Sequence, residues 1–165
     1  NNAGFGMVGA AHTLDMEKEE QMLQLLVVTP TQLCKCCLRD MYKRGSGKIL
    51  NVASVGAFQP GPYTASYYAS KSYLYQYSQA IRLEAKKQGV QVCTLCPGST
   101  RTHFFEKTGA KTPIWAMSPE RVAKEAWEGL NADKAVVVPG MINRLLRLVP
   151  AQIKAYGVAL LKKHT

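Results

Sequence analysis

The chain has 165 residues, 47% of them hydrophobic, and 21 Lys and Arg against 11 Asp and Glu, which gives a formal net charge of +10. This length is typical of one domain with a substantial core, and the composition excludes a disordered chain. No apolar run approaches the ~18 residues of a membrane span, so we expect a cytoplasmic protein. No nucleic-acid motif accompanies the basic excess, so nucleic acid is not an expected partner.

The first half of the chain predicts a helix, a strand and a second helix. Residues Asp15–Lys43 form a helical pattern with acids early and bases late, which suits the helix dipole, and Pro30 is expected to kink it. Residues 48–53 are apolar and nearly continuous rather than alternating, as in a strand that is covered on both faces. A second helix is predicted over 66–88.

The second half continues the same alternation of strands and helices. Apolar runs at 90–96 and 135–138 predict two further buried strands. Between them, Ser118 is placed to cap a third helix, with Pro119 at its first position. Strands that alternate with helices of this length predict a doubly wound α/β fold, in which helices cover both faces of a parallel sheet.

The five cysteines suggest free thiols in a reducing compartment, because the number is odd and no secretion signal opens the chain. Cys93 and Cys96 spell Cys-x-x-Cys, but residues three apart on a strand point to opposite faces, so no shared metal ion is expected. Cys34, Cys36 and Cys37 lie in a helical stretch, where we expect small buried hydrophobes.

Tyr67 and Lys71 are the first candidate catalytic pair, because residues four apart on a helix share a face. Six of the eight tyrosines lie between Tyr63 and Tyr77, and Tyr67 is the one among them with a Lys four residues later. A cation about 4 Å away could lower a phenol pKa by ~3 units at an effective dielectric of ~20. The alternative is an ordinary surface pair, which is common at this spacing.

Three polar or small-residue segments fall where ligands bind in open α/β sheets. Ser54 follows the strand at 48–53, and carboxyl ends of parallel strands form the binding edge of such sheets. The segment 97–102 follows the next strand and offers backbone amides and hydroxyls after a Pro-Gly turn. At the front, residues 1–6 form a small-residue turn that lets a ligand approach the backbone closely.

Together these motifs resemble the short-chain dehydrogenase/reductase family. The matching pieces are Asn1-Asn2-Ala3-Gly4, Asn51-Val52-Ala53-Ser54, Tyr67-x-x-x-Lys71 and Pro97-Gly98-x-x-x-Thr102. The resemblance extends over residues 1–139. It implies a Rossmann-type sheet, NAD or NADP as cofactor, and the interconversion of a carbonyl and an alcohol by hydride transfer.

The resemblance also implies a role for each matching residue. Tyr67 would be the general acid/base, Lys71 would lower its pKa and hold the nicotinamide ribose, and Ser54 would orient the substrate oxygen. The remaining positions would contact the cofactor: Asn2, Ala3 and Gly4 on its adenosine side, and Pro97, Gly98 and Thr102 against the nicotinamide and its carboxamide. The family also implies a homo-oligomer.

Two departures from the family pattern set expectations for this chain. The family begins with a Gly-rich pyrophosphate-binding unit that is not in this sequence, so we expect an N-terminally truncated fold that lacks on the order of 70–90 residues. The family also places an Asn on the long helix to complete a proton relay. Here that position corresponds to Leu26, which cannot hydrogen-bond.

The segment from His103 to Trp115 and Met117 occupies the place of the family's substrate lid. Phe104, Phe105, Trp115 and Met117 make it apolar, which favours a hydrophobic substrate; the alternative is that they pack onto the core. His103 is expected to be a solvated loop residue, because Tyr67 already fills the role of base.

Residues 140–165 form a separate tail, which predicts a cationic amphipathic helix pair broken at Pro150. Between Pro139 and Thr165 there are five basic residues and no acid. One interpretation is peripheral contact with an anionic membrane, and the other is a helix that covers a dimer or core surface.

Two further hypotheses stand beside an NAD(P)-dependent oxidoreductase. The first is a non-catalytic interaction module or inactive fragment that keeps the dehydrogenase fold, which Leu26 and the missing nucleotide-binding half would favour. The second is a membrane-surface protein whose tail is the functional element.

Overall fold

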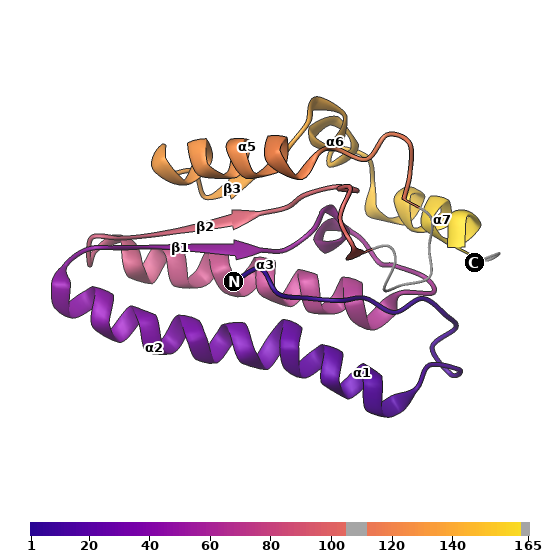
Figure 1. The fold of residues 1–165 in the computed structure, drawn as a ribbon, viewed down its shortest axis with the longest axis horizontal. Coiled ribbons are helices and arrows are strands. Elements are labelled where there is room, and N and C mark those ends of the chain that lie inside the picture. Colours follow the sequence, from indigo (N-terminus) through magenta and orange to yellow (C-terminus); the bar gives the residue numbers. More distant parts are fainter. Residues whose placement is uncertain (105–111, 163–165) are drawn as a thin grey trace.

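A computed structural model of the chain describes residues 1–104 and 112–162. Its centre is a parallel sheet of three strands in the order β1-β2-β3 (Figure 1). The strands are β1 (Gly47–Val52), β2 (Val90–Leu95) and β3 (Val136–Val137). The three predicted strands are confirmed, although β3 pairs over two residues rather than the four of its apolar run.

The first residue of the chain lies along the free edge of β1. Its carbonyl accepts a hydrogen bond from the amide of Val52 at 2.9 Å, and its amino group donates to the Leu50 carbonyl at 2.9 Å. The segment after Asn1 therefore leaves the sheet at the carboxyl end of β1. This places the small-residue turn at the same edge as Ser54.

Helices cover both faces of the sheet, as predicted (Figure 1). On one face, α2 and α3 pack against Ile49, Val90 and Val92. On the other face, α5 packs against Cys93, Leu95 and Val137. The helix bounds are α1 (Met16–Leu23), η1 (Gln24–Val28), α2 (Thr29–Arg44), α3 (Ala65–Lys86) and α5 (Pro119–Asn131). Ser118 caps α5 by accepting from the Arg121 amide.

The long first helix is interrupted close to Pro30, where the sequence predicts a kink. The turn Gln24–Val28 widens into a π-helix, and α2 starts at Thr29 with Pro30 in its first turn. Proline has no N–H to donate to a carbonyl four residues earlier, so the wider turn accommodates the missing hydrogen bond. Leu26, which cannot hydrogen-bond, lies inside this widened turn and is 1% exposed.

The cysteines follow the prediction in part. Cys34, Cys93 and Cys96 are buried, with Cys93 and Cys96 in different core clusters. The prediction that Cys36 and Cys37 are also buried is wrong, because both lie on the exposed side of α2. A helix that packs through one stripe buries every third or fourth residue, and Cys34 and Leu38 occupy that stripe.

The predicted tail forms two helices, α6 (Met141–Leu146) and α7 (Ala151–Lys162), separated by Pro150. They lie beyond the carboxyl ends of the strands, on the side of the sheet that α5 covers (Figure 1). None of the helices among the described residues is long and apolar enough to cross a membrane.

Candidate active site

The candidate site lies beyond the carboxyl ends of β1 and β2. The two strands stay hydrogen-bonded past their last residues, through the amide of Ala53 to the Leu95 carbonyl and the amide of Val55 to the Pro97 carbonyl. Ser54 is fixed between these two bonds. Its Oγ accepts from the Gly56 amide at 3.0 Å, and this bond begins the short helix η2 (Val55–Phe58).

Tyr67, in the first turns of α3, points its ring to the same edge. Its phenol lies close enough to the Ser54 side chain for this hydroxyl to lower its pKa, and its ring centroid lies 5.5 Å from that of Phe104. Burial raises the pKa of Tyr67 to about 12, and the hydrogen bond from Ser54 opposes this shift without cancelling it. The phenol therefore holds its proton at neutral pH.

Lys71 is 5% exposed and lies one turn further along α3. Its Nζ donates to the Val52 carbonyl at 2.8 Å and stands 5.8 Å from the centroid of the Tyr67 ring. Burial lowers the pKa of Lys71 to about 8. Tyr67 and Lys71 thus share a face of α3, and Ser54, which precedes Tyr67 by 13 residues, lies at the same edge of the sheet.

The electrostatic argument made from the sequence is wrong in one respect. A cation at about 4 Å was expected to lower the pKa of Tyr67, but the pKa is raised. The Lys71 Nζ lies 5.8 Å from the ring centroid, and desolvation of the phenol is the largest influence on its pKa. Burial thus shifts the pKa of each group toward its neutral form, but Lys71, with a pKa of about 8, remains mostly protonated at neutral pH.

The turn at the N-terminus meets Lys71 from the other side. A Cβ added to Gly4 would lie 2.9 Å from a methyl carbon of Leu26 and 3.9 Å from the Lys71 Nζ. Asn2, Ala3 and Gly4 are all exposed at this edge. The backbone of residues 2–4 is exposed, carries little side-chain bulk and lies beside the Lys71 ammonium. This arrangement leaves room for a polar group such as a ribose to approach the main chain.

The loop after β2 is braced by hydrogen bonds to the segment before α5. The Arg101 amide donates to the Met117 carbonyl at 2.9 Å, and the Met117 amide donates to the Ser99 carbonyl at 2.9 Å. Gly98 lies against the side chain of Asn143, which would collide with any Cβ there. Thr102 is exposed, and its Oγ1 accepts from the Phe104 amide at 3.4 Å.

The residues predicted to form an apolar lid have different environments. Phe104 is half-buried against Tyr67, whereas Trp115 is 75% exposed. Met117 packs against the core cluster under α5, as the alternative interpretation expected. Phe105 lies outside the described residues. His103 is exposed, in agreement with a loop position.

Sequence analysis missed the contact between the tail and the site. Tyr68 lies against Gly56 and Gly61; a Cβ on Gly61 would collide with its ring, and one on Gly56 would lie in tight contact with it. The Nζ of Lys162, at the end of α7, lies 5.8 Å from the Tyr68 ring centroid. Gly61 in the Pro-Gly-Pro turn is a sequence signal for the close approach of a bulky side chain such as Tyr68, because glycine has no side chain to block it. No comparable signal indicates the contact of Lys162 with Tyr68.

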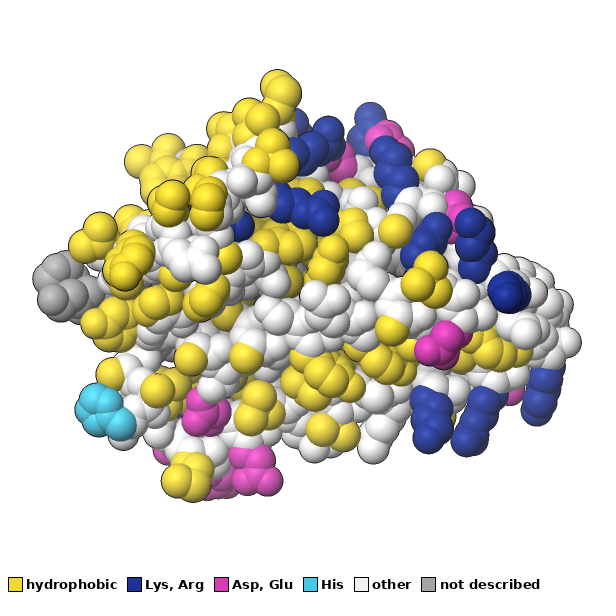
Figure 2. Space-filling view, turned by 180° about the vertical axis from the view of Figure 1, so that it is seen from behind, with side chains coloured by type: hydrophobic (Ala, Val, Ile, Leu, Met, Phe, Trp, Pro, Cys, Tyr) yellow, Lys and Arg dark blue, Asp and Glu magenta, His cyan; other side chains and the backbone are white. Residues whose placement is uncertain are grey.

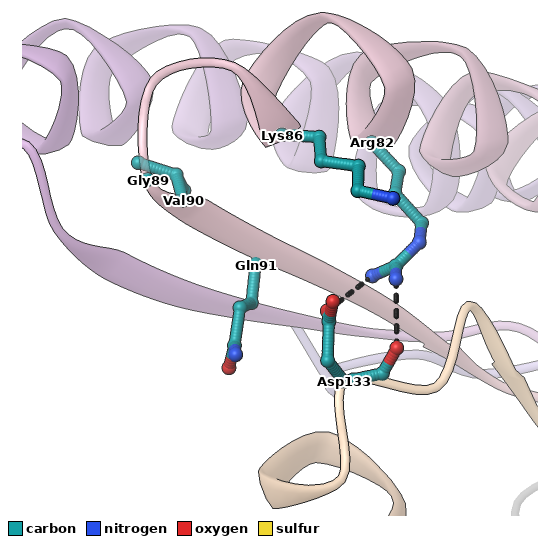
Figure 3. A pocket seen from close by; sticks show the side chains of 6 residues that line it. All are labelled: Arg82, Lys86, Gly89, Val90, Gln91 and Asp133. Atoms are coloured by element: carbon teal, nitrogen blue, oxygen red, sulfur yellow. Dashed lines mark hydrogen bonds and ion pairs between the residues drawn. The ribbon is translucent and has the colours of Figure 1, made fainter.

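A separate hollow lies at the opposite, amino end of the strands (Figure 3). It has a volume of about 250 Å³ and is lined by Arg82, Lys86, Gly89, Val90, Gln91 and Asp133. Arg82 donates to the Asp133 carboxylate at 2.8 Å and to its carbonyl at 2.7 Å, and the Gln91 side chain points away from both (Figure 3). These bonds join α3 to the segment after α5, and they leave Arg82 satisfied.

The fold and the arrangement of Ser54, Tyr67 and Lys71 define a class of Rossmann-type proteins. Over residues 1–113 the chain matches the short chain dehydrogenase family, and it belongs to that family. It is 28% identical over 170 residues to YbbO, an uncharacterised oxidoreductase of Escherichia coli, with 93% of this chain and 63% of YbbO covered. The chain thus spans less than two thirds of that relative's length.

Two other relatives agree with this assignment. A 3-ketodihydrosphingosine reductase of Bacteroides thetaiotaomicron is 35% identical over 106 residues, which cover 64% of this chain and 39% of that protein. The structure of a short-chain dehydrogenase from Sphingobium yanoikuyae in complex with NADPH superposes with a TM-score of 0.82 at 25% identity. That superposition covers 94% of this chain and 62% of the other.

Proposed function

We propose that the protein is an oxidoreductase that interconverts a carbonyl and an alcohol with NADP or NAD as cofactor. The single observation that carries this proposal is the contact of Tyr67 with Ser54 beside the buried ammonium of Lys71. Membership of the short chain dehydrogenase family supports it, and so does the NADPH bound in the Sphingobium relative.

In the proposed mechanism, the cofactor when bound supplies or accepts the hydride, and the protein positions the groups and moves the proton. Ser54 donates a hydrogen bond to the substrate oxygen, and Tyr67 exchanges a proton with that same oxygen. Lys71 would hold the ribose hydroxyls with the donors that it does not give to Val52. Asn2, Ala3 and Gly4 would line the adenosine side of the cofactor, and Pro97, Gly98 and Thr102 would lie against its nicotinamide.

The protonation state of Tyr67 favours reduction of a carbonyl over oxidation of an alcohol. With its pKa raised to about 12, the phenol begins each encounter as a proton donor. A donor beside the substrate oxygen stabilises the alkoxide that forms when a carbonyl accepts a hydride.

A hydrophobic carbonyl compound is the proposed substrate class. Phe104 lies against the Tyr67 ring, so the space next to the reacting oxygen has an apolar wall. The Bacteroides relative is named as a reductase of a keto compound, which agrees with this class.

The test is the Tyr67→Phe substitution in the full natural protein, with Tyr68→Phe as the matched control. Oxidation of NADPH and NADH is followed with a panel of aliphatic and aromatic ketones. The removal of the proton donor is expected to lower kcat by ~10²–10⁴-fold with cofactor binding retained. Tyr68→Phe is expected to keep activity, and equal turnover in both variants would contradict the role of Tyr67.

A non-catalytic interaction module is the second candidate, because buried Leu26 stands where the family carries Asn and fills the space beside Gly4. This candidate predicts that the full natural protein binds NADPH or NADH and oxidises neither with any ketone of the panel. Turnover that depends on Tyr67 would exclude it.

A homo-oligomer is also part of the proposal. The outer faces of α2 and α3 expose Leu33, Tyr73 and Leu83, and apolar side chains on neighbouring helices suit a contact between two copies. Light scattering coupled to gel filtration measures this directly, and a monomer at micromolar concentration would contradict it.

A further inference from the structure

In the tail helices α6 and α7 the large apolar side chains face solvent, while several polar side chains contact the body of the protein. In an ordinary surface helix the apolar stripe faces the core and charged residues face water. Nine large apolar residues of the tail are instead 50–81% exposed. We call them the tail face: Met141, Ile142, Leu145, Leu146, Leu148, Ile153, Tyr156, Leu160 and Leu161.

In α6 the polar residues are used to attach the helix to the body. Asn143 donates to the Pro139 carbonyl at 2.7 Å. Arg144 donates to the Val138 carbonyl and to the Glu125 carboxylate, each at 2.9 Å. Arg147, one residue past the end of α6, lies 4.8 Å from the Phe58 ring centroid. The apolar residues between them are left on the outside.

In α7 the two lysines have the same inward placement. The Nζ of Lys154 donates to the Phe58 carbonyl at 3.4 Å, and Lys162 lies over the Tyr68 ring. Partial burial lowers the pKa of both lysines. Ile153, Tyr156 and Leu160 recur at helical spacing on the opposite side, where they are exposed.

The apolar surface continues beyond the tail itself. Ile114 is 95% exposed and Trp115 is 75% exposed, and the same segment contacts α6 through Met117, which lies against Gly140. Figure 2 shows hydrophobic side chains gathered at the upper left, where α6 and α7 lie in that view. An exposed apolar surface on this scale marks a place where the protein contacts a partner.

We propose that the tail face, together with Ile114 and Trp115, docks on the surface of an anionic lipid bilayer. The charge of the tail favours this partner, because residues 140–165 contain five Lys and Arg and no Asp or Glu. Bulky aliphatic residues enter the acyl boundary, an interfacial Trp and Tyr lie at the headgroup level, and the net positive charge of the tail attracts the protein to an anionic surface.

The same charge argues against a second copy of the chain as the occupant. In a two-fold symmetric dimer the same patch lies on both sides of the interface. The basic tail of one copy would then lie against the basic tail of the other, without acids from either tail to balance the charge. Like charges across an interface oppose association.

The first experiment measures sedimentation of the full natural protein with vesicles of phosphatidylcholine, alone and mixed with phosphatidylserine. We expect binding to the mixed vesicles that weakens as salt is raised. Leu160→Glu with Leu161→Glu is expected to lower the partition coefficient by at least ~100-fold, since two buried leucines are lost. The matched control is Met16→Glu, which places a carboxylate at an equally exposed apolar position on α1 and is expected to bind normally.

A second measurement does not depend on how the tail variants fold. Residues 1–165 contain two tryptophans, so Trp127→Phe on α5 leaves Trp115 as the one reporter among these residues. Its fluorescence is expected to shift to the blue and to be quenched by brominated lipid in mixed vesicles. Wild-type protein that stays in the supernatant, or an unquenched Trp115, would overturn the proposal. A tail variant that changes the oligomeric mass but binds vesicles normally would overturn it in favour of a protein interface.

Discussion

Helix α3 presents a cation to each end of the sheet, and the two cations have different surroundings. Lys71 and Arg82 are 11 residues apart, which is close to three helical turns, so they share a face of α3. Arg82 has three acceptors within 2.8 Å: the Val92 carbonyl and the carboxylate and carbonyl of Asp133. Lys71 is more deeply buried, and among the described residues it has one acceptor, the Val52 carbonyl, and no carboxylate.

This difference distinguishes a structural cation from one that is available to a ligand. A buried cation without a countercharge costs free energy, and the lowered pKa of Lys71 reflects that cost. Proteins keep such groups at functional sites more often than elsewhere. The pair Arg82 and Asp133 shows the opposite pattern, because Arg82 holds the pKa of the Asp133 carboxyl below its usual value.

The largest effect is expected when Lys71 loses its charge and Arg82 keeps its own. Lys71→Met should lower kcat/KM by ~10²–10⁴-fold, because the variant loses the donor to the ribose and the cation beside the proton donor. Steady-state NADPH oxidation with the best ketone of the panel measures this. The matched variant Arg82→Met should keep kcat/KM. If kcat/KM fell equally in both variants, the proposed difference between the cation at the carboxyl end of the sheet and the cation at the amino end would be contradicted.

Ser54→Ala tests the same end of the sheet through its hydroxyl. The substitution removes the hydrogen bond to Tyr67 and the proposed bond to the substrate oxygen, so kcat should fall by ~10²-fold. Ser54→Thr keeps a hydroxyl and should restore most of the activity. A Ser54→Ala enzyme with unchanged kcat would contradict the role of Ser54 as the group that orients substrate.

Arg82→Met should change stability rather than catalysis. The variant leaves the Asp133 carboxylate and two carbonyls without their donor, and the free energy of unfolding should fall by ~2 kcal/mol. Urea denaturation followed by circular dichroism measures the change. A stable variant would show that the amino end of the sheet does not depend on this link.

The pH dependence of stability should reveal the buried ammonium of Lys71. Its folded-state pKa of about 8 lies below the 10.5 of the ordinary group, so the unfolded chain binds more protons between these values. Stability from this group therefore rises with pH through that window, and its destabilising effect is complete below pH ~8.

The comparison of wild type with Lys71→Met isolates this effect from the two buried thiols, Cys93 and Cys96, whose pKa values are raised. Between pH ~8 and ~9, wild type should gain about 1 kcal/mol relative to Lys71→Met. Chemical denaturation of both proteins at each pH measures the gap. A constant gap would contradict a lowered pKa for Lys71.

Much of the fold and of the site could be predicted because the signals are local. Apolar runs placed the strands, and the spacing of Tyr67 and Lys71 placed two groups on one turn of α3. The rise of the Tyr67 pKa could not be read from spacing, because it depends on how much protein surrounds the ring. The inward lysines of α7 also escaped prediction, since a helical pattern does not say which of its faces meets the body.

The smallest effect is expected for Asp133→Asn, which removes the charge from the ion pair and keeps its shape. Asp133 has a positive φ of 50°, a conformation that Asn adopts readily, so the backbone and its carbonyl bond to Arg82 should persist. Its side chain is 42% exposed, and an ion pair that is open to solvent contributes ~1 kcal/mol or less. Urea denaturation should therefore show a much smaller loss than Arg82→Met. Equal losses would mean that the charge of Asp133, rather than the set of acceptors around Arg82, stabilises this end of the sheet.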